Sequence, residues 1–109
     1  MSDGKSALGL SPNAAAALAY VFGFISGLII FILEKDNRYV RLHAMQSVIL
    51  SVVFLVTGVI AGFIPFLGPV LGIIISIVSL ICWVIGIVKA AQGEYYRFPV
   101  VGEYAERQI

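Results

Sequence analysis

The chain has 109 residues, of which 61% are hydrophobic and 12% are charged, whereas a soluble domain carries about 25% charged residues. This composition excludes an ordinary water-soluble domain, because too few polar side chains are present to cover its surface. The net charge of +1 and the lack of a dense basic patch exclude nucleic acid as a partner.

The charges are segregated along the chain. None occurs from Ser6 to Leu33, and none from Leu42 to Val88 apart from the titratable His43. An uncharged apolar run of about 18 residues or more indicates a membrane span, because a hydrocarbon core about 30 Å thick needs about 20 helical residues. We therefore expect an all-α membrane protein with three transmembrane helices in a compact bundle, followed by a short amphipathic cytoplasmic C-terminal segment.

The first apolar element follows a short polar leader, residues 1–12, which we expect to be mobile. Asn13 stands in a helix-capping position, and the sequence after it predicts a first span over about residues 14–33. The charged stretch "EKDNR" then predicts a turn outside the hydrocarbon, in which Asp36 or Asn37 caps the next helix.

The second apolar run, from Leu42 to Val88, is too long for one crossing. Its 47 residues would measure roughly 70 Å as a single helix, about twice the thickness of a bilayer. The stretch "FIPFLGP" favours a reversal, because Pro65 and Pro69 lack amide protons and Gly68 tolerates a turn. We predict spans over about 40–64 and 70–91, a membrane domain over 13–92 and an interfacial tail over 93–109.

The lysine and arginine positions predict an orientation. With three spans, the leader and the "FIPFLGP" hairpin share one side, which carries Lys5 alone. The other side carries six basic residues: Lys35, Arg38, Arg41, Lys89, Arg97 and Arg107. Because cytoplasmic loops are enriched in lysine and arginine, we expect the N-terminus outside and the C-terminus in the cytoplasm, in the plasma membrane of a prokaryote.

Small residues recur at helical spacing in each predicted span. In lipid, helices associate largely through close backbone approach along such faces, although glycine is also simply common in membrane helices. We expect these faces to join the spans to one another or to join subunits. The helix-packing residues predicted in this way are Ala19, Gly23, Gly27, Gly58, Gly62, Gly72 and Gly86.

A polar cluster opens the second predicted span, in the stretch "RYVRLHAMQS". Its residues are Arg38, Arg41, His43, Gln46 and Ser47. The arginines are placed to reach lipid phosphates, and the spacing of the other three puts them on one side of the helix. Two interpretations stay open: the histidine and glutamine either hydrogen-bond to a neighbouring helix end or to the tail, or they form a ligand or proton site.

The tail sequence "KAAQGEYYRFPVVGEYAERQI" is the second informative stretch. Gly93 is suited to end the third span, and Tyr95 and Tyr96 suit the headgroup depth. After Pro99 and Gly102, apolar and charged residues fall on opposite faces of a short helix. We expect this helix to lie on the membrane or against the ends of the spans, with a frayed tail as the alternative.

The chain offers no catalytic motif and no metal-ligand pattern, since it has one histidine and one cysteine, Cys82. We expect no enzymatic activity and no cofactor. The expected function is a scaffold or accessory subunit that assembles with itself or with a membrane partner; the alternative is an oligomeric channel or protein-translocation component. The expected partners are the lipid bilayer and anionic headgroups at Arg38, Arg41 and Arg97.

The stretches "NRYVRLHAMQS" and "KAAQGEYYRFPVVGEYAE" resemble a family of small prokaryotic membrane proteins of unknown function. Those proteins in turn resemble the channel subunit of the Tic import translocon of plastids. The resemblance runs from about Asn13 to Glu106 and implies a compact helical membrane domain. It also implies five signature positions: Arg41, His43, Gln46, Pro99 and Gly102.

Overall fold

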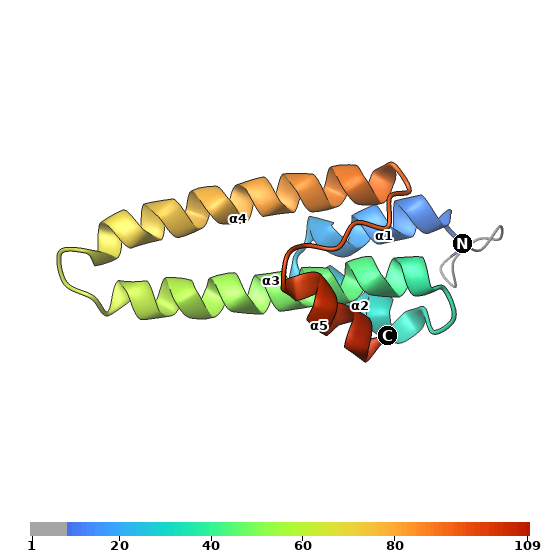
Figure 1. Ribbon diagram of the computed structural model, residues 1–109, viewed down its shortest axis with the longest axis horizontal. Coiled ribbons are helices and arrows are strands. Elements are labelled where there is room, and N and C mark those ends of the chain that lie inside the picture. Colours follow the sequence, from blue (N-terminus) through green and yellow to red (C-terminus); the bar gives the residue numbers. More distant parts are fainter. Residues whose placement is uncertain (1–8) are drawn as a thin grey trace.

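The computed structural model describes residues 9–109, which are helical except for turns and the connecting segments (Figure 1). The leader predicted over residues 1–12, with Lys5, therefore lies largely outside the described part of the chain. The helices within that part are α1 (Pro12–Val21), α2 (Phe24–Leu33), α3 (Arg38–Gly62), α4 (Gly68–Ala91) and α5 (Val101–Gln108).

Helices α3 and α4 form a long antiparallel hairpin. The Asn37 side chain caps α3 by accepting a hydrogen bond from the Val40 amide at 3.2 Å. The chain reverses between Gly62 and Gly68, and Pro69 stands in the first turn of α4, where its missing amide proton costs nothing. The reversal predicted from "FIPFLGP" is thus confirmed, and the spans predicted over 40–64 and 70–91 correspond to these two helices.

Both helices of this hairpin are long and apolar enough to cross a membrane. Their 25 and 24 residues correspond to about 37 Å and 36 Å at 1.5 Å per residue, more than the roughly 30 Å of hydrocarbon. Their outer halves expose large aliphatic side chains on most sides, as expected of a surface that faces lipid.

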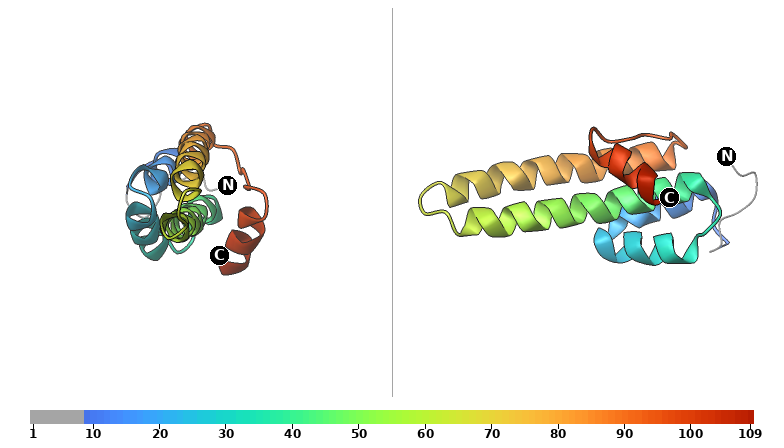
Figure 2. Two further views of the ribbon diagram at one scale, coloured as in Figure 1. Left: turned by 90° about the vertical axis from the view of Figure 1, so that its left-hand side faces the viewer. Right: turned by 60° about the horizontal axis from the view of Figure 1, so that its bottom comes forward.

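The prediction of a single span over 14–33 is wrong, because that segment is two helices of ten residues each. The break lies at Phe22 and Gly23, and Gly23 has a φ of 61°, a conformation that suits glycine. Helix α2 runs back antiparallel to α1 (Figure 2). Each helix is only about 15 Å long, so the α1–α2 hairpin reaches about half-way along α3 and α4.

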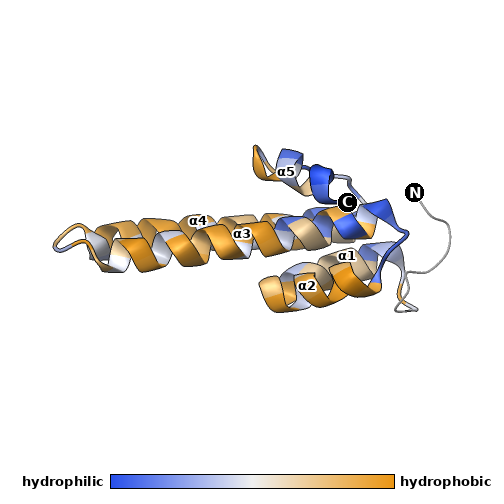
Figure 3. Ribbon diagram, turned by 90° about the horizontal axis from the view of Figure 1, so that it is seen from below, coloured by the Kyte–Doolittle hydropathy of each residue, from blue (hydrophilic) through white to orange (hydrophobic). Residues whose placement is uncertain are grey.

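This reversal also changes which ends of the helices lie together. The Asn13 side chain does not cap α1, which is capped by Ser11; instead its Nδ2 donates to the Ala91 carbonyl at 3.2 Å. The start of α1 therefore lies beside the end of α4, whereas three full spans would have put them on opposite sides. The hydrophilic residues gather at this end, away from the α3–α4 turn (Figure 3).

The tail turns back from the end of α4 and places α5 across the outside of α3 (Figure 1). Gly93 has a φ of 78°, and the Glu94 amide donates to the Lys89 carbonyl at 3.0 Å, which closes the end of α4 as predicted for this glycine. Helix α5 buries Gly102 and Ala105. Buried residues concentrate at this end of the molecule, where α1, α2 and the tail surround the first half of α3.

Candidate functional site

The candidate site is a buried polar network between α1, α3 and the tail. Tyr20 comes from the last turn of α1, and His43 and Gln46 come from the second and third turns of α3. All three side chains are almost completely excluded from solvent, with His43 and Gln46 at 0% exposure. Burial of so many polar atoms is costly unless each finds a partner.

The two ring nitrogens of His43 both have partners. Nε2 lies 2.9 Å from the Glu94 carbonyl oxygen, which can only accept, so Nε2 carries the proton and donates. Nδ1 is then an acceptor, and the Tyr20 hydroxyl donates to it at 2.7 Å. The His43 ring is also held edge-on between the rings of Tyr20 and Tyr39, at centroid distances of 5.5 and 4.9 Å.

Gln46 holds the tail by its backbone. Its Nε2 donates to the Tyr96 carbonyl at 2.9 Å and to the Tyr20 hydroxyl oxygen at 3.2 Å. Its Oε1 accepts from the Phe98 amide at 2.8 Å. One side chain therefore satisfies a donor and an acceptor of the extended tail, much as a neighbouring strand would.

Close approach of the tail depends on Gly102. A Cβ on Gly102 would lie 2.5 Å from the Arg97 Cβ and 3.0 Å from the Gln46 Oε1. Tyr39 ties α3 to the end of α4, from which the tail departs, because its hydroxyl donates to the Ala90 carbonyl at 2.6 Å. The tail is thus docked through residues 94–102. His43 and Gln46 hydrogen-bond to it, which is the first of the two interpretations that the sequence left open.

A second polar group supports the break between α1 and α2. Ser47 Oγ donates to the Ala19 carbonyl at 2.7 Å and lies 3.0 Å from the Gly23 carbonyl. Ser26 Oγ donates to the same Ala19 carbonyl and accepts from the Phe22 amide. Trp83 Nε1 on α4 donates to the Tyr20 carbonyl at 2.7 Å. These bonds replace the helical bonds lost at the break, which lipid could not supply.

Sequence reasoning missed three contributors to these networks: Tyr20, Ser26 and Trp83. Each is a polar-tipped side chain inside an apolar run. Such side chains need partners in hydrocarbon, and this was the available signal.

Two of the basic residues of the predicted cluster are bound within the protein in different ways. Arg41 caps the end of α2, donating through Nη1 to the Phe31 and Glu34 carbonyls at 3.1 and 2.7 Å, and its guanidinium stacks over the Phe31 ring at 4.0 Å. Arg38 is 59% exposed and lies 4.0 Å from Glu106.

Ionic contacts at the surface join α5 to the tail. Arg97 donates to Glu106 at 2.7 Å, and the Tyr95 hydroxyl donates to the same carboxylate at 3.0 Å. The hydrogen bond from Arg97 lowers the pKa of Glu106, and partial burial raises the pKa of Tyr95. Exposed pairs of this kind stabilise weakly, so we assign most of the docking to the buried bonds of His43 and Gln46.

The predicted helix-packing residues divide into two sets. A Cβ on Gly86 would lie 2.6 Å from the Tyr20 ring, and one on Gly27 would lie 2.9 Å from the Ala44 carbonyl, so both glycines lie at tight helix contacts. Ala19 is buried, and Gly23 forms the break described above. By contrast, a Cβ on Gly58, Gly62 or Gly72 would meet nothing within 4 Å.

The arrangement offers hydrogen bonds but no obvious reaction centre. Among residues 9–109, no three His, Cys, Asp or Glu side chains lie close enough together to hold a metal ion. Both ring nitrogens of His43 are hydrogen-bonded to protein atoms. These partners are the Tyr20 hydroxyl and the Glu94 carbonyl, so neither is a cysteine thiol or a serine hydroxyl. Chemically, the network is suited to fix the tail in one position.

Comparison with known proteins gives the family. The family model described as "Magnetosome magnetite crystal formation protein family" matches residues 6–105. The chain belongs to this family. A UPF0132 membrane protein of Methanocaldococcus jannaschii is 40% identical over 104 residues, covering 95% of this chain and 94% of the relative. One from Archaeoglobus fulgidus is 40% identical over 100 residues, covering 92% and 97%.

The predicted resemblance to small prokaryotic membrane proteins is confirmed, since these relatives are archaeal and are named as membrane proteins. The further resemblance to the plastid Tic subunit has no support in these comparisons. No solved structure matches the chain.

Proposed function

We propose that the protein is a non-enzymatic membrane scaffold, which assembles with itself or with a membrane partner through the outer half of α3. The observation that carries this proposal is the pair Gly58 and Gly62. They are four residues apart, in the sequence "GVIAG", and a Cβ on either glycine would meet nothing within 4 Å. Small residues in this spacing let a second helix approach closely within a bilayer.

The rest of the molecule supports the same role. The inner half of the helical hairpin is covered by α1, α2 and the tail, whereas its outer half exposes aliphatic side chains and the open glycines. The polar network uses its side chains to hold the tail, so that α5 is presented as a rigid element at the polar end. A fixed platform at one end and an open helix face at the other suit a protein that organises neighbours.

The test is self-association in lipid vesicles, measured by single-molecule photobleaching of a labelled chain at increasing protein-to-lipid ratios. We expect dimers or larger species for the native chain and monomers for Gly62→Leu. Since a Cβ on Gly62 would meet nothing within 4 Å, we expect the substitution to leave the monomer fold intact. Ile60→Phe enlarges an apolar side chain on the opposite face of α3, by less than Gly62→Leu does, and is the control.

Two results would overturn the self-assembly form of this proposal. One is a native chain that stays monomeric at every ratio. The other is a Gly62→Leu variant that associates as the native chain does. If the native chain is monomeric, crosslinking from position 62 in native membranes tests whether it binds a different membrane protein. Recovery of uncrosslinked monomer alone would exclude such a partner.

We further propose that the polar end faces the cytoplasm. The basic residues of the described chain lie at that end, and none lies in the α3–α4 turn (Figure 3). In a Cys82→Ser background, cysteines at Asp36 and Gln92 are then labelled by an impermeant reagent only in inside-out vesicles, and one at Phe66 only in intact cells. Labelling of residues 36 and 92 from opposite sides would contradict the helix arrangement itself.

Anionic lipid is a second proposed partner, through the exposed guanidinium groups of Arg38 and Arg97. Arg41 is left out of this proposal because its Nη1 is occupied by α2. Replacing Arg38 and Arg97 by glutamine should weaken co-sedimentation with anionic vesicles. Unchanged binding would remove lipid headgroups from the list of partners.

The break at Gly23 favours one alternative function, an oligomeric channel or translocation component. Interrupted helices that end half-way across a bilayer are typical of transport proteins. Reconstituted protein that shows neither conductance nor solute flux, under conditions where the assembly is demonstrated, would eliminate this alternative.

A further inference from the structure

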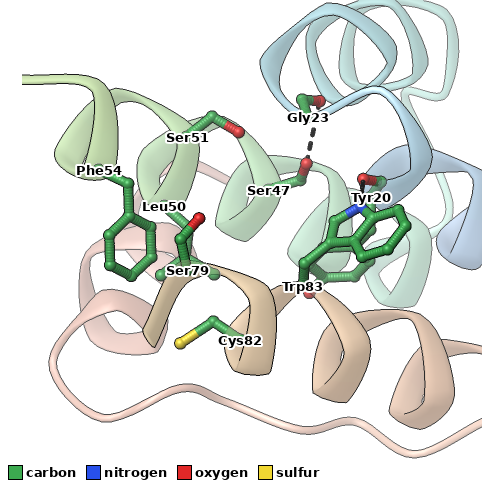
Figure 4. A pocket seen from close by; sticks show the side chains of 9 residues that line it. All are labelled: Tyr20, Gly23, Ser47, Leu50, Ser51, Phe54, Ser79, Cys82 and Trp83. Atoms are coloured by element: carbon green, nitrogen blue, oxygen red, sulfur yellow. Dashed lines mark hydrogen bonds between the residues drawn. The ribbon is translucent and has the colours of Figure 1, made fainter. Parts of the chain in front are cut away.

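A partly open cavity of about 50 Å³ lies under the tip of the α1–α2 hairpin, between α3 and α4 (Figure 4). Leu50 and Ser79, which line it, are the thirteenth of 25 residues in α3 and the twelfth of 24 in α4. The cavity is therefore at the middle of both long helices, which corresponds to the centre of the bilayer when these helices span it.

The walls of this cavity are unusually polar for that depth. Besides apolar residues, its lining includes three serines, Ser47, Ser51 and Ser79, and Cys82. The Ser47 hydroxyl is already bonded to the break in the first apolar segment. Ser51 and Ser79 come from the facing helices α3 and α4 (Figure 4).

These last two hydroxyls have no protein partner among the described residues. The usual solution for a hydroxyl on a membrane helix is a bond to its own helix, and Thr57 makes such a bond to the Val53 carbonyl at 2.8 Å. Leaving a hydroxyl unbonded in hydrocarbon is costly, because nothing in an alkane replaces its hydrogen bonds to water. We therefore expect a molecule that hydrogen-bonds to both hydroxyls to occupy the cavity.

The available space limits what the occupant is. A water molecule needs about 10 to 15 Å³ of such space and two to four polar partners. The cavity holds a few water molecules, or one neutral molecule of a few heavy atoms, between the two serines. A charged ligand is disfavoured, because the lining residues carry no charge to compensate it.

We propose that this cavity is a mid-membrane binding site for a small neutral hydroxyl compound, either water or a short alcohol, held between Ser51 and Ser79. The site goes beyond the proposed scaffold function and does not depend on it, since it is complete within one chain. The cavity lies where the cover provided by α1 and α2 ends.

The test uses the complete chain in lipid bilayers. Water-edited solid-state NMR measures how fast magnetisation passes from water to each serine side chain. Transfer to Ser51 and Ser79 should be several-fold faster than transfer to Ser76, which lies one turn from Ser79 on α4, is exposed to lipid and does not line the cavity. Ser79→Val should abolish the fast transfer at Ser51, and Ser76→Val should leave it unchanged.

A second arm separates the two occupants. Titration with methanol should shift the Ser51 and Ser79 resonances in a saturable way and slow the transfer from water. Fast transfer without a saturable shift by methanol would show that the site binds water and would exclude a short alcohol as its ligand. If Ser51 and Ser79 take up magnetisation as slowly as Ser76, and methanol shifts neither, the cavity is dry and the proposal fails.

Discussion

Replacing Gln46 by methionine tests whether the buried network holds the tail. Methionine keeps the length of the side chain but removes both polar atoms, so the Tyr96 carbonyl and the Phe98 amide lose their partners. Two hydrogen bonds to the tail at about 1 kcal/mol each, increased by the cost of leaving the buried tail groups unbonded, give roughly 2 to 4 kcal/mol. That range corresponds to an increase of about 30-fold to 1,000-fold in the population with the tail undocked.

Amide hydrogen exchange at Phe98 measures this directly, because its N–H donates to the Gln46 Oε1 and is released only when the tail opens. We expect protection at Phe98 to fall by the same factor in Gln46→Met. Gln92→Met makes the same chemical change at an exposed position at the end of α4 and is the matched control. Equal protection at Phe98 in the native chain and in Gln46→Met would refute the reasoning.

Two further predictions concern helix packing and acid sensitivity. Gly86→Ala should lower the thermal unfolding temperature in detergent, because the new Cβ would lie 2.6 Å from the Tyr20 ring; Gly72→Ala meets nothing and should be neutral or slightly stabilising. Because the Arg97 hydrogen bond lowers the pKa of Glu106, that contribution to docking of α5 is complete above the ordinary glutamate pKa and is lost as the pH falls through the lowered value. The protection factors of the α5 amides, which correct for the slower intrinsic exchange in acid, should therefore fall on acidification in the native chain. In Glu106→Gln the protection factors should be lower than in the native chain already at neutral pH and should lack this acid step.

Much of the long helical hairpin could be predicted from the sequence. Charge segregation and length identify two spans close to the observed bounds of α3 and α4, because hydrocarbon thickness restricts spanning helices strongly. The apolar run between the charged ends is too long for one crossing, so it must reverse. Pro65 and Pro69 identify where it does so. The spacing of His43 and Gln46 also identified two residues of the buried network.

The break after α1 could not be predicted by the same rules. The mean hydropathy of a segment does not show whether the chain continues straight or reverses within it. The stretch "AAAALAYVFGFISGLIIFIL" is therefore long and apolar enough for a membrane span whether it crosses the bilayer or turns back. Gly23 and Gly27 look alike in the sequence, yet one has a positive φ and the other lies in a regular helix against Ala44. What distinguishes them is the set of partners supplied by Ser47 on α3 and Trp83 on α4, and these tertiary contacts are not visible in a local pattern.

The short α1–α2 hairpin gives the molecule an unequal cross-section. When α3 and α4 span a bilayer, one half of it contains the helices α1 to α4 and the edge of the tail, and the other half contains only the ends of α3 and α4 (Figures 2 and 3). Each copy would then displace more lipid from one leaflet than from the other. Many copies packed side by side would bend the bilayer toward the leaflet that contains only the ends of α3 and α4. The local density of the protein would then set the preferred curvature of the membrane.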